Sequence, residues 1–498
     1  MEYFSLKSLK SGTDVRGVAV GGNITLTDEA VTLISRAFVK WLSVRYKKNK
    51  FSIAVGNDSR ISAQRILNCV RLGVLSSGSD LVYTGLSSTP SMFMLLKTSF
   101  GCDASIMITA SHLPSDRNGL KFFTPEGGLD GKDVDEILSI AESGNFLNGQ
   151  GGYSEKSFMD EYSRMLVENV RESCKTNQTL KGKKIILAAG NVAGGFFAEK
   201  VLTPLGADVT GSQFLQPDGT FPNHIPNPED SGAIESLSKA VVKNKADLGI
   251  IFDTDVDRAG AVNFDGKEIN RNRLIALLAA ILLKDKAGVI VTDSVTSDGL
   301  TKFIEGLGGK HLRYKRGYKN VIDKSKELND GGVYSPLAVE TSGHAAFKEN
   351  YFLDDGAYLV TKLLICIANL KEGQNLTDMI ASLEEPYECA EVRITFNENS
   401  SDFKSEGKSV IEDLKRFAQS NDNLTLAPDN YEGARINFSK GAGDGWTLVR
   451  MSVHDPVMPI NFESRVLGGN KKMAEKLLVL LSGYPFLEVK PLSDFIKK

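Results

Sequence analysis

The stretch that decides the fold runs from Ala104 to Lys121 and reads ASIMITASHLPSDRNGLK. Its apolar start, Ile106 to Ile108, predicts the end of a buried strand. A proline and the Asn118-Gly119 pair then predict a loop. Ser111 therefore stands where a strand ends, and open α/β sheets bind their ligands at the carboxyl ends of strands. Serine is also a common turn or cap residue, so a covalent centre and a plain turn are both open at this point.

Strands and helices alternate on both sides of this stretch up to about residue 370. Apolar runs predict strands at 51–55, 80–84, 184–187, 248–252 and 288–292. Helical spacing predicts helices at 27–48, 62–76, 155–172, 271–284, 296–306 and 354–370, and a further helix after Gly195. The βαβ rhythm recurs three times, which is typical of mostly parallel sheets covered by helices.

The chain beyond residue 375 has a different pattern. Strand patterns at 391–396 and 446–452, with helical spacing at 402–419 and 471–482, predict an antiparallel α+β domain. A length of 498 residues and a Gly- and Asn-rich linker at 144–152 also favour several domains. We place four domains at 1–152, 153–262, 263–374 and 375–498, the first three α/β and the last α+β.

Composition narrows the class of function. The net charge of −3 gives no long-range field for nucleic acid or an anionic membrane, so neither is expected as a partner. The five cysteines are scattered and form no CxxC pair, which fits a reducing compartment rather than a disulfide framework. No apolar run approaches 18 residues, and the N-terminus lacks the order of a signal peptide. We expect a cytoplasmic protein, or a plastid one if a transit peptide has been removed.

The sharpest chemical motif is Asp253-Thr-Asp-Val-Asp-Arg258, directly after the predicted strand 248–252. Its three carboxylates, Asp253, Asp255 and Asp257, either share a face if extended or wrap one cation if the chain turns. Oxygen ligands alone indicate a hard divalent cation, Mg²⁺ or Ca²⁺. An EF-hand is excluded, because its sixth and twelfth positions would be arginine and phenylalanine here. A solvated acidic turn is the alternative.

Three later loops carry polar groups suited to a sugar phosphate. Residues 340–344 read ETSGH, and their hydroxyls, carboxylate and imidazole suit a sugar ring. Residues 315–319 read KRGYK, a cationic turn suited to a phosphate. Residues 450–456 read RMSVHDP and can face one anion. The chain has only five histidines, and three of them, His112, His344 and His454, fall inside the loops with candidate chemistry.

These loops together resemble the α-D-phosphohexomutase family of phosphoglucomutases, phosphomannomutases and phosphoglucosamine mutases. Residues 109–114 resemble its phosphoserine loop T-A-S-H-N-P, and residues 253–258 resemble its metal loop D-G-D-x-D-R. Residues 340–344 are similar to its sugar loop, and residues 12–17 to its N-terminal arginine loop. The resemblance covers essentially the whole chain. It implies four domains around a central cleft, three of them related α/β units with mixed, mostly parallel sheets.

The resemblance also implies an activity and a role for each site residue. The activity is the interconversion of a hexose 1-phosphate and a hexose 6-phosphate, of glucose or mannose, by a monomer or dimer. Ser111 would carry the phosphoryl group, and hexose 1,6-bisphosphate would be the intermediate and activator. Mg²⁺ would be held by Ser111, Asp253, Asp255 and Asp257. The transferring group would be surrounded by Arg16, His112, Lys121 and Arg258. Sugar hydroxyls would be held by Glu340 and Ser342. The distal phosphate would lie near Lys315, His344, Arg450, Ser452 and His454.

One loop departs from the family pattern, which reads R-P-S-G-T-E-P where this chain has RMSVHDP. Val453 stands at the glycine position, where backbone approaches phosphate closely. The departure leaves open a phosphoglucosamine or acetylglucosamine phosphate mutase, or a degenerate family member that binds sugar phosphates without turning them over. A metal-dependent phosphatase, in which water takes the phosphoryl group from Ser111, is a further alternative.

Overall fold

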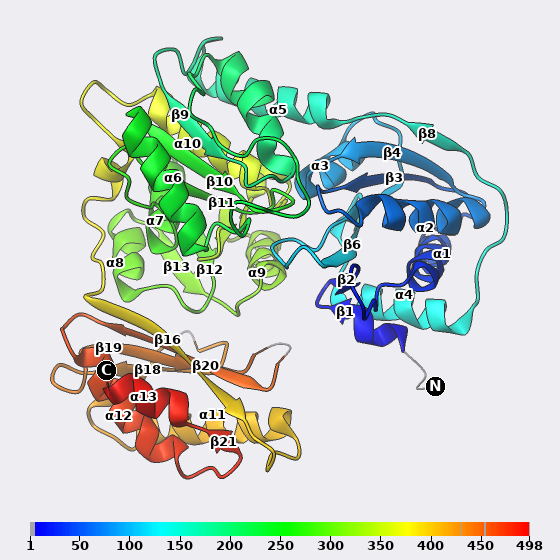
Figure 1. Cartoon of the computed structure of the whole chain (residues 1–498). Coiled ribbons are helices and arrows are strands. Elements are labelled where there is room, and N and C mark those ends of the chain that lie inside the picture. The colour runs from blue at the N-terminus through cyan, green and yellow to red at the C-terminus, as the bar shows by residue number, and fades with distance from the viewer. Residues whose placement is uncertain (1–4, 429, 453–454, 498) are drawn as a thin grey trace. The chain divides into compact units, whose positions relative to one another are not determined.

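The computed structural model describes residues 5–428, 430–452 and 455–497 (Figure 1). It divides into two compact units, each of which is built from two stretches of the chain. Unit 1 comprises Met1–Asn270 and Ser342–Asp378, and unit 2 comprises Arg271–Thr341 and Met379–Lys498. The predicted boundaries at 152, 262 and 374 divide the chain more finely than these two units and stay a prediction. None of the helices in the described residues is long and apolar enough to cross a bilayer.

The first sheet of unit 1 is mixed. Its strands are β1 (Lys10–Ser11), β2 (Asp14–Val18), β3 (Ser52–Asn57), β4 (Asp80–Leu86), β5 (Ala104–Ile108), β6 (Arg117–Thr124), β7 (Gly127–Gly128) and β8 (Tyr153–Glu155). The order is β1-β2-β6-β5-β3-β4-β8, and β7 pairs with β6. Strands β5, β3, β4 and β8 pair in parallel, whereas β1, β2 and β6 add an antiparallel edge. The carboxyl end of β5, where Ser111 follows, therefore lies in the middle of the sheet.

Helices cover this sheet with apolar faces. The helices of the region are α1 (Asp28–Tyr46), α2 (Ala63–Ser76), α3 (Thr89–Met94) and α4 (Gly131–Ser143). The buried faces of α1, α2 and α4 share one hydrophobic core with strands β3, β5 and β6. Thr27 and Asp130 cap α1 and α4 through their side-chain oxygens, which satisfies amide groups that a helix start leaves unpaired. The predicted helices at 27–48 and 62–76 are confirmed to within two residues.

The predicted loop at Asn118-Gly119 is wrong, because both residues lie inside β6. Gly119 pairs with Arg16 of β2, and a Cβ atom there would stand 2.2 Å from the carbonyl oxygen of Val15. The side-chain amide of Asn118 donates through Nδ2 to Ser62 Oγ at 2.9 Å. The Asn-Gly pair therefore serves close strand packing and not a turn.

The second sheet of unit 1 holds the acidic motif. Its strands are β9 (Ile185–Ala188), β10 (Leu248–Phe252) and β11 (Ala259–Asn263), in the order β11-β10-β9. Strands β9 and β10 pair in parallel, and β10 and β11 in antiparallel. The helices of this part are α5 (Met159–Cys174), α6 (Ser231–Asn244) and α10 (Gly356–Ala368). Strand β15 (Ala345–Phe347) and the 3-10 turn η6 (Lys348–Asn350) precede α10.

Two predicted helices of unit 1 differ from the structure. The helix predicted from residue 155 begins at Met159, because β8 ends at Glu155 after pairing with β4. The helix predicted after Gly195 is present, but its hydrogen bonding is irregular: the 3-10 turn η3 (Ala193–Gly195) precedes it, and the π-helical η4 (Ala198–Leu202) and the 3-10 turn η5 (Thr203–Leu205) form its later part. Pro204 lacks the amide hydrogen that a continuing helix needs.

Unit 2 contains three strands that pair in parallel and a separate antiparallel sheet. In the first part, β12 (Val289–Thr292) pairs in parallel with β13 (Lys310–Arg313) and β14 (Leu337–Val339). Its helices are α7 (Asn272–Leu283), α8 (Asp298–Gly306) and α9 (Tyr318–Asp330).

The second part of unit 2 has the antiparallel sheet that its sequence predicts. The strand order is β17-β18-β19-β20-β16-β21, and every pair in it is antiparallel. The strands are β16 (Glu388–Phe396), β17 (Leu424–Leu426), β18 (Ala434–Phe438), β19 (Gly445–Val449), β20 (Val457–Ser464) and β21 (Leu487–Glu488). Its helices are α11 (Phe403–Gln419), α12 (Gly469–Leu481) and α13 (Lys490–Lys497).

Candidate active site

Ser111 follows β5 in a strained and buried turn. Its side chain and backbone are only 3% exposed, and its φ of 52° lies in the left-handed region that side chains other than glycine rarely adopt. The hydroxyl of Thr109 accepts a hydrogen bond from the Ser111 amide at 3.0 Å. Such strain persists only where the surroundings fix the backbone, and it concentrates at functional sites.

The acidic motif turns back on itself between β10 and β11. The Asp253 amide donates to the Arg258 carbonyl at 3.3 Å, and Val256 has a φ of 66°. One carboxylate oxygen from each of Asp253, Asp255 and Asp257 lies within 4.8 Å of the others, and all three residues are buried. The motif therefore adopts the turned arrangement and not the extended one. Because all three aspartates are buried, a solvent-exposed acidic turn is excluded.

Unit 1 brings Ser111 onto this acidic loop across 142 residues of sequence. The Ser111 hydroxyl donates to Asp253 Oδ2 at 3.1 Å and lies 3.3 Å from His112 Nδ1. Arg258 Nη2 lies 3.5 Å from the same hydroxyl, and Arg258 Nε donates to Asp253 Oδ2 at 3.1 Å. One oxygen nucleophile thus stands among a carboxylate, a guanidinium and an imidazole.

Lys121 of β6 enters the loop from the other sheet of unit 1. Its ammonium lies 2.8 Å from Asp255 Oδ2 and 2.6 Å from Asp257 Oδ2. The other oxygens of these two carboxylates, Asp255 Oδ1 and Asp257 Oδ1, are buried and have no hydrogen-bond partner among the described residues. Buried polar atoms without partners are costly, so both oxygens are suited to a cation. The acidic cluster can hold a metal ion.

Two acids of the loop have pKa values that are shifted in opposite directions. Burial, together with the neighbouring Asp257 carboxylate, raises the pKa of Asp253 well above its usual range. Burial would also raise the pKa of Asp257, but the nearby cations, Lys121 foremost, hold it below the usual range. A divalent cation would relieve the repulsion between these carboxylates.

Two histidines flank the loop with opposite protonation. Burial and the nearby cations lower the pKa of His112 to about 3, so its imidazole is neutral. His344 Nδ1 lies 2.5 Å from Asp354 Oδ2 and 4.0 Å from Asp257 Oδ1. Burial would lower the pKa of His344, but the Asp354 and Asp257 carboxylates raise it to about 9.

The remaining predicted residues of unit 1 lie on β2 and after Thr341. Arg16 Nη2 donates to Asp14 Oδ2 at 2.7 Å, and its charge contributes to the low pKa of His112. Ser342 is buried, and its Oγ has no hydrogen-bond partner among the described residues. The family resemblance implied that His344 belongs with the distal phosphate residues, whereas the structure places it against Asp257.

Unit 2 holds the other predicted residues. Glu340 Oε1 accepts the Gly317 amide at 2.6 Å, which ties the predicted sugar loop to the cationic turn. Lys315 in that turn is exposed, and Arg450 is buried at 6% exposure. Burial lowers the pKa of Arg450, and the charge of Glu432 opposes this shift.

The altered loop at 450–456 is described only in part. The Ser452 amide donates to the Val457 carbonyl at 2.8 Å, and Ser452 Oγ accepts the Asp455 amide at 3.3 Å. His454, predicted to lie near the distal phosphate, falls outside the described residues, as does Val453.

Comparison with known families places this chain beside proteins of one family. The models of three phosphoglucomutase/phosphomannomutase alpha/beta/alpha domains match in order: domain I at residues 8–148, domain II at 160–266 and domain III at 270–387. These matches cover well over half of the chain. The chain belongs to the α-D-phosphohexomutase family. The three matched domains, with the antiparallel sheet that follows them, confirm the predicted fold class of this phosphohexomutase.

Relatives match the phosphohexomutase over most of its length. A phosphoglucomutase of Neisseria meningitidis serogroup A is 30% identical over 481 residues, which are 95% of this chain and 96% of that protein. A phosphomannomutase/phosphoglucomutase of Pseudomonas aeruginosa is 29% identical over 454 residues, or 91% of this chain and 90% of that protein. The solved structure of a phosphoglucomutase/phosphomannomutase family protein from Burkholderia thailandensis has a TM-score of 0.80 at 26% identity and covers 97% of this chain and 98% of that chain. By family, the phosphohexomutase is an isomerase, and a sugar phosphate is the class of substrate that fits it.

Sequence reasoning missed three residues that shape the phosphohexomutase site: Asp58, Arg60 and Asp354. Asp58 accepts the Thr109 hydroxyl at 2.7 Å, and Arg60 hydrogen-bonds the backbone of the Ser111 loop. A signal existed for both, since they follow β3, which is the parallel neighbour of β5. Asp354 had no signal beyond its position ten residues after His344.

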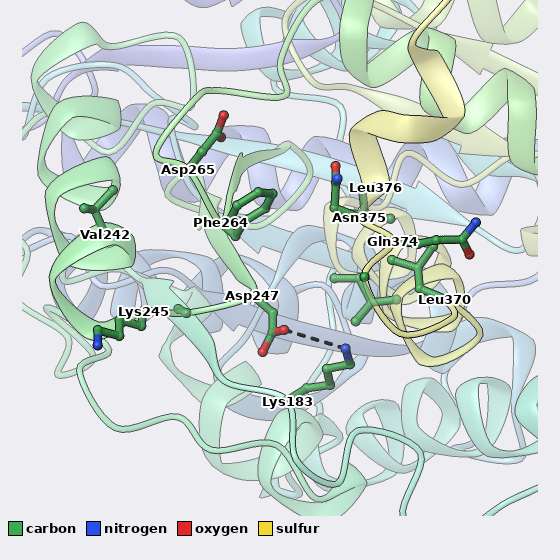
Figure 2. Close-up of a pocket in the computed structure, with 13 residues that line it drawn as sticks. Lys183, Val242, Lys245, Asp247, Phe264, Asp265, Leu370, Gln374, Asn375 and Leu376 are labelled. Carbon is green, nitrogen blue, oxygen red and sulfur yellow. Dashed lines mark ion pairs between the residues drawn. The ribbon is translucent and has the colours of Figure 1, made fainter.

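A separate pocket of about 540 Å³ lies in unit 1 away from this site. Figure 2 shows its lining, which includes Lys183, Phe264 and Leu370. Asp247, which also lines the pocket, precedes β10, whereas Asp253 follows β10. The two sites therefore stand at opposite ends of one strand, about 20 Å apart at the rise of a β-strand. The phosphohexomutase loops do not line this pocket.

Proposed function

We propose that this phosphohexomutase interconverts the 1-phosphate and 6-phosphate of a hexose, glucose or mannose, through a phosphoserine at Ser111. The observation that carries the proposal is the convergence of Ser111 Oγ with Asp253 and Arg258, at 3.1 and 3.5 Å. Phosphoryl transfer needs positioning and positive charge more than it needs covalent chemistry, and this constellation supplies both. Family membership supports the same reaction class.

The first transfer moves a phosphoryl group from Ser111 to the sugar. The bond between phosphorus and Ser111 Oγ breaks, a bond between phosphorus and the sugar hydroxyl oxygen forms, and the hydroxyl proton leaves to a neighbouring base. His112, neutral and 3.3 Å from Ser111 Oγ, is placed to hydrogen-bond at this oxygen. Arg258 stabilises the negative charge that stays on the serine oxygen.

The second transfer reverses these steps at the other end of the sugar. The sugar then carries two phosphates as hexose 1,6-bisphosphate and presents its other phosphate to Ser111. A bond from that phosphorus to Ser111 Oγ forms as the bond to the sugar oxygen breaks, so the phosphoserine is restored. Water must be excluded between the two steps, because water attack would turn the enzyme into a phosphatase.

The proposed metal is Mg²⁺, held by Ser111 Oγ with Asp253, Asp255 and Asp257. Oxygen-only ligands, together with the two unpartnered buried carboxylate oxygens, support a hard divalent cation. When bound, Mg²⁺ supplies positive charge to the transferring phosphoryl group. Lys121 and Arg16 add further cations around the same group.

The proposed sugar and distal phosphate contacts follow from the loops of 340–344, 315–319 and 450–456. Glu340 and Ser342 hold sugar hydroxyls in this proposal. Lys315, Arg450, Ser452 and His454 bind the phosphate that is not being transferred. His344 is assigned to the transferring group instead, because it contacts Asp257.

The decisive experiment is intact-mass spectrometry of the untreated protein combined with mutase assays. We expect a population about 80 Da heavier, mapped to Ser111, and loss of both this mass and mutase activity in Ser111→Ala. Ser115→Ala, in the same loop, is the matched control and keeps both. Full mutase activity in Ser111→Ala would refute the phosphoserine mechanism.

A substrate panel identifies the sugar. The panel contains the 1-phosphates of glucose, mannose, glucosamine and N-acetylglucosamine, each followed for the 6-phosphate and for free phosphate. Conversion of glucose or mannose 1-phosphate supports the proposal. A preference for an amino sugar would match one relative, a phosphoglucosamine mutase of Caldicellulosiruptor bescii at 29% identity, and would replace the proposed hexose. Release of free phosphate without isomer would indicate a phosphatase.

A further inference from the structure

A fully buried arginine lies against the Ser111 loop and takes no part in the proposed transfer. Arg60 follows β3, and its side chain and that of Asp58 are both 0% exposed. Arg60 Nε donates to Asp58 Oδ2 at 3.2 Å, and the Arg60 amide donates to Asp58 Oδ1 at 3.0 Å. A buried charge is costly unless every donor finds an acceptor, so the partners of the other guanidinium nitrogens show what this arginine does.

Those nitrogens hydrogen-bond backbone carbonyls of one loop. Arg60 Nη1 donates to the carbonyls of Pro114 and Arg117, at 2.6 and 2.9 Å. Arg60 Nη2 donates to the carbonyl of Leu113 at 2.7 Å and also to the carbonyl of Ser111 itself. One rigid, planar group therefore holds four carbonyls: those of Ser111, Leu113 and Pro114 in the loop, and that of Arg117 at the start of β6.

A second path from Arg60 reaches the other side of Ser111. Asp58 Oδ2 accepts the Thr109 hydroxyl at 2.7 Å, and the Thr109 oxygen accepts the Ser111 amide at 3.0 Å. The carbonyl and the amide of Ser111 are thus both fixed by the same ion pair. The left-handed φ of 52° at Ser111 is the conformation that this double attachment holds.

We infer that Arg60 is a positioning residue for phosphoryl transfer: it fixes the backbone of Ser111 on both sides, so that the serine oxygen stays at the acidic loop. The inference rests on the proposed function of Ser111. Displacement of a reacting atom by about 1 Å can slow a reaction roughly a hundredfold, so a loosened loop lowers the transfer rate while leaving substrate affinity in place.

Arg65 provides a matched control in the same segment of the chain. It lies on α2 and donates through Nη2 to two loop carbonyls, those of Ala19 and Leu26, at 3.0 and 3.1 Å. Its partners belong to a loop without a predicted site residue. A purely structural contribution of arginine-to-carbonyl bonds would make Arg60 and Arg65 variants behave alike.

The experiment compares Arg60→Lys with Arg65→Lys in steady-state and single-turnover assays with glucose 1-phosphate. Lysine keeps the positive charge but has one nitrogen in place of the fork, so it cannot reach four carbonyls. We expect kcat of Arg60→Lys to fall roughly ten- to a hundredfold with KM within about twofold, and the single-turnover transfer from phosphoserine to slow by the same factor. Arg65→Lys stays within about twofold of the wild type in both. Equal kcat in the two variants, or a loss confined to KM, would overturn the inference.

A second pair of variants decides the matter if Arg60→Lys does not fold. Thr109→Val removes the hydroxyl between Asp58 and the Ser111 amide without changing the volume, and Thr109→Ser restores it. We expect Thr109→Val to lose kcat at least about tenfold and Thr109→Ser to recover most of that loss; equal kcat values would refute the positioning role. Mass analysis of the wild type separates this inference from the proposed function. Wild-type protein without phosphate on Ser111 contradicts the proposed function, whereas phosphorylated variants that transfer at the wild-type rate contradict only the role of Arg60.

Discussion

At the scale of single residues, the site is organised by Lys121, which occupies one side of the acidic loop. Its ammonium contacts Asp255 Oδ2 and Asp257 Oδ2, while the opposite oxygens of both carboxylates have no hydrogen-bond partner among the described residues. The lysine and a metal ion would thus share two carboxylates from different sides. Lys121 then has two opposing effects: it weakens the attraction of the loop for a cation, and it supplies positive charge to the transferring group.

Replacement of Lys121 separates these two effects. In Lys121→Gln the loop loses a positive charge, so we expect Mg²⁺ to half-activate the enzyme at a lower concentration than in the wild type. We also expect kcat at saturating Mg²⁺ to fall about a hundredfold, since a cation at the developing charge is lost. Titration of chelator-treated protein with Mg²⁺ measures both quantities, and Lys132→Gln on the exposed side of α4 is the control. A half-activating Mg²⁺ concentration that is higher in Lys121→Gln than in the wild type would contradict the shared-carboxylate arrangement.

At the scale of elements, the candidate site is built where β3, β5 and β10 end. Each of these strands has five or six residues and contains a short apolar run, so its position was predictable from sequence. The predicted Ser111 and Asp253 follow directly from such strand ends. Strand β6, which carries Lys121, was not predictable in this way, because its Asn118-Gly119 pair is typical of a turn in sequence and serves close strand packing in the fold. The position of Arg60 after β3 was predictable, but its role was not. Its partners are backbone carbonyls, and contacts to backbone leave no pattern of residue types in the sequence.

Helices α5 and α10 of unit 1 are joined by a buried polar contact. Tyr162 of α5 donates its hydroxyl to Asp355 Oδ1 at 2.7 Å, and the same oxygen accepts the Tyr358 amide at the start of α10. Asp355 is 1% exposed, and burial raises its pKa to about 6 despite these hydrogen bonds. The raised pKa means that the folded protein binds a proton at Asp355 more tightly than the unfolded chain does.

The sign of the resulting pH dependence follows from linkage. The proton on Asp355 stabilises the folded state below pH 4, and this contribution is lost as the pH rises through about 6. Asp355→Asn keeps a neutral side chain at every pH. We therefore expect its stability relative to the wild type to improve between pH 4 and pH 7, by at most about 3 kcal/mol. Thermal melting of both proteins across this range measures the difference, and a constant difference would show that Asp355 does not titrate in the window.

At the scale of the whole molecule, the chain crosses between its two units three times, and one crossing falls inside a predicted site loop. The boundary between Thr341 and Ser342 separates Glu340 from Ser342 and His344. Motif spacing indicated that these residues share a loop, but it could not indicate the compact unit to which each belongs, because such units are defined by long-range packing.

A buried arginine, Arg435, connects the two parts of unit 2. Arg435 of β18 is 2% exposed and donates to the Ser294 carbonyl at 2.8 Å and to Asp298 Oδ1 at 2.9 Å. Its guanidinium carbon lies 3.6 Å from the centre of the Trp446 ring. The antiparallel sheet is thereby attached to the segment at the start of α8, and Arg435→Met should loosen this attachment.

The expected effect is local to unit 2 and measurable by hydrogen exchange. Hydrogen bonds to a charged group contribute about 1.5–3 kcal/mol each, so loss of the pair should speed amide exchange in α8 and β18 by at least about tenfold. Strands β3 and β5 of unit 1 should exchange as in the wild type. Arg465→Met is the control, because its ion pair with Asp444 is half-exposed and such pairs contribute little. Unchanged exchange in α8 would show that Arg435 does not hold unit 2 together, and equal acceleration in β5 would show that the two units do not open independently.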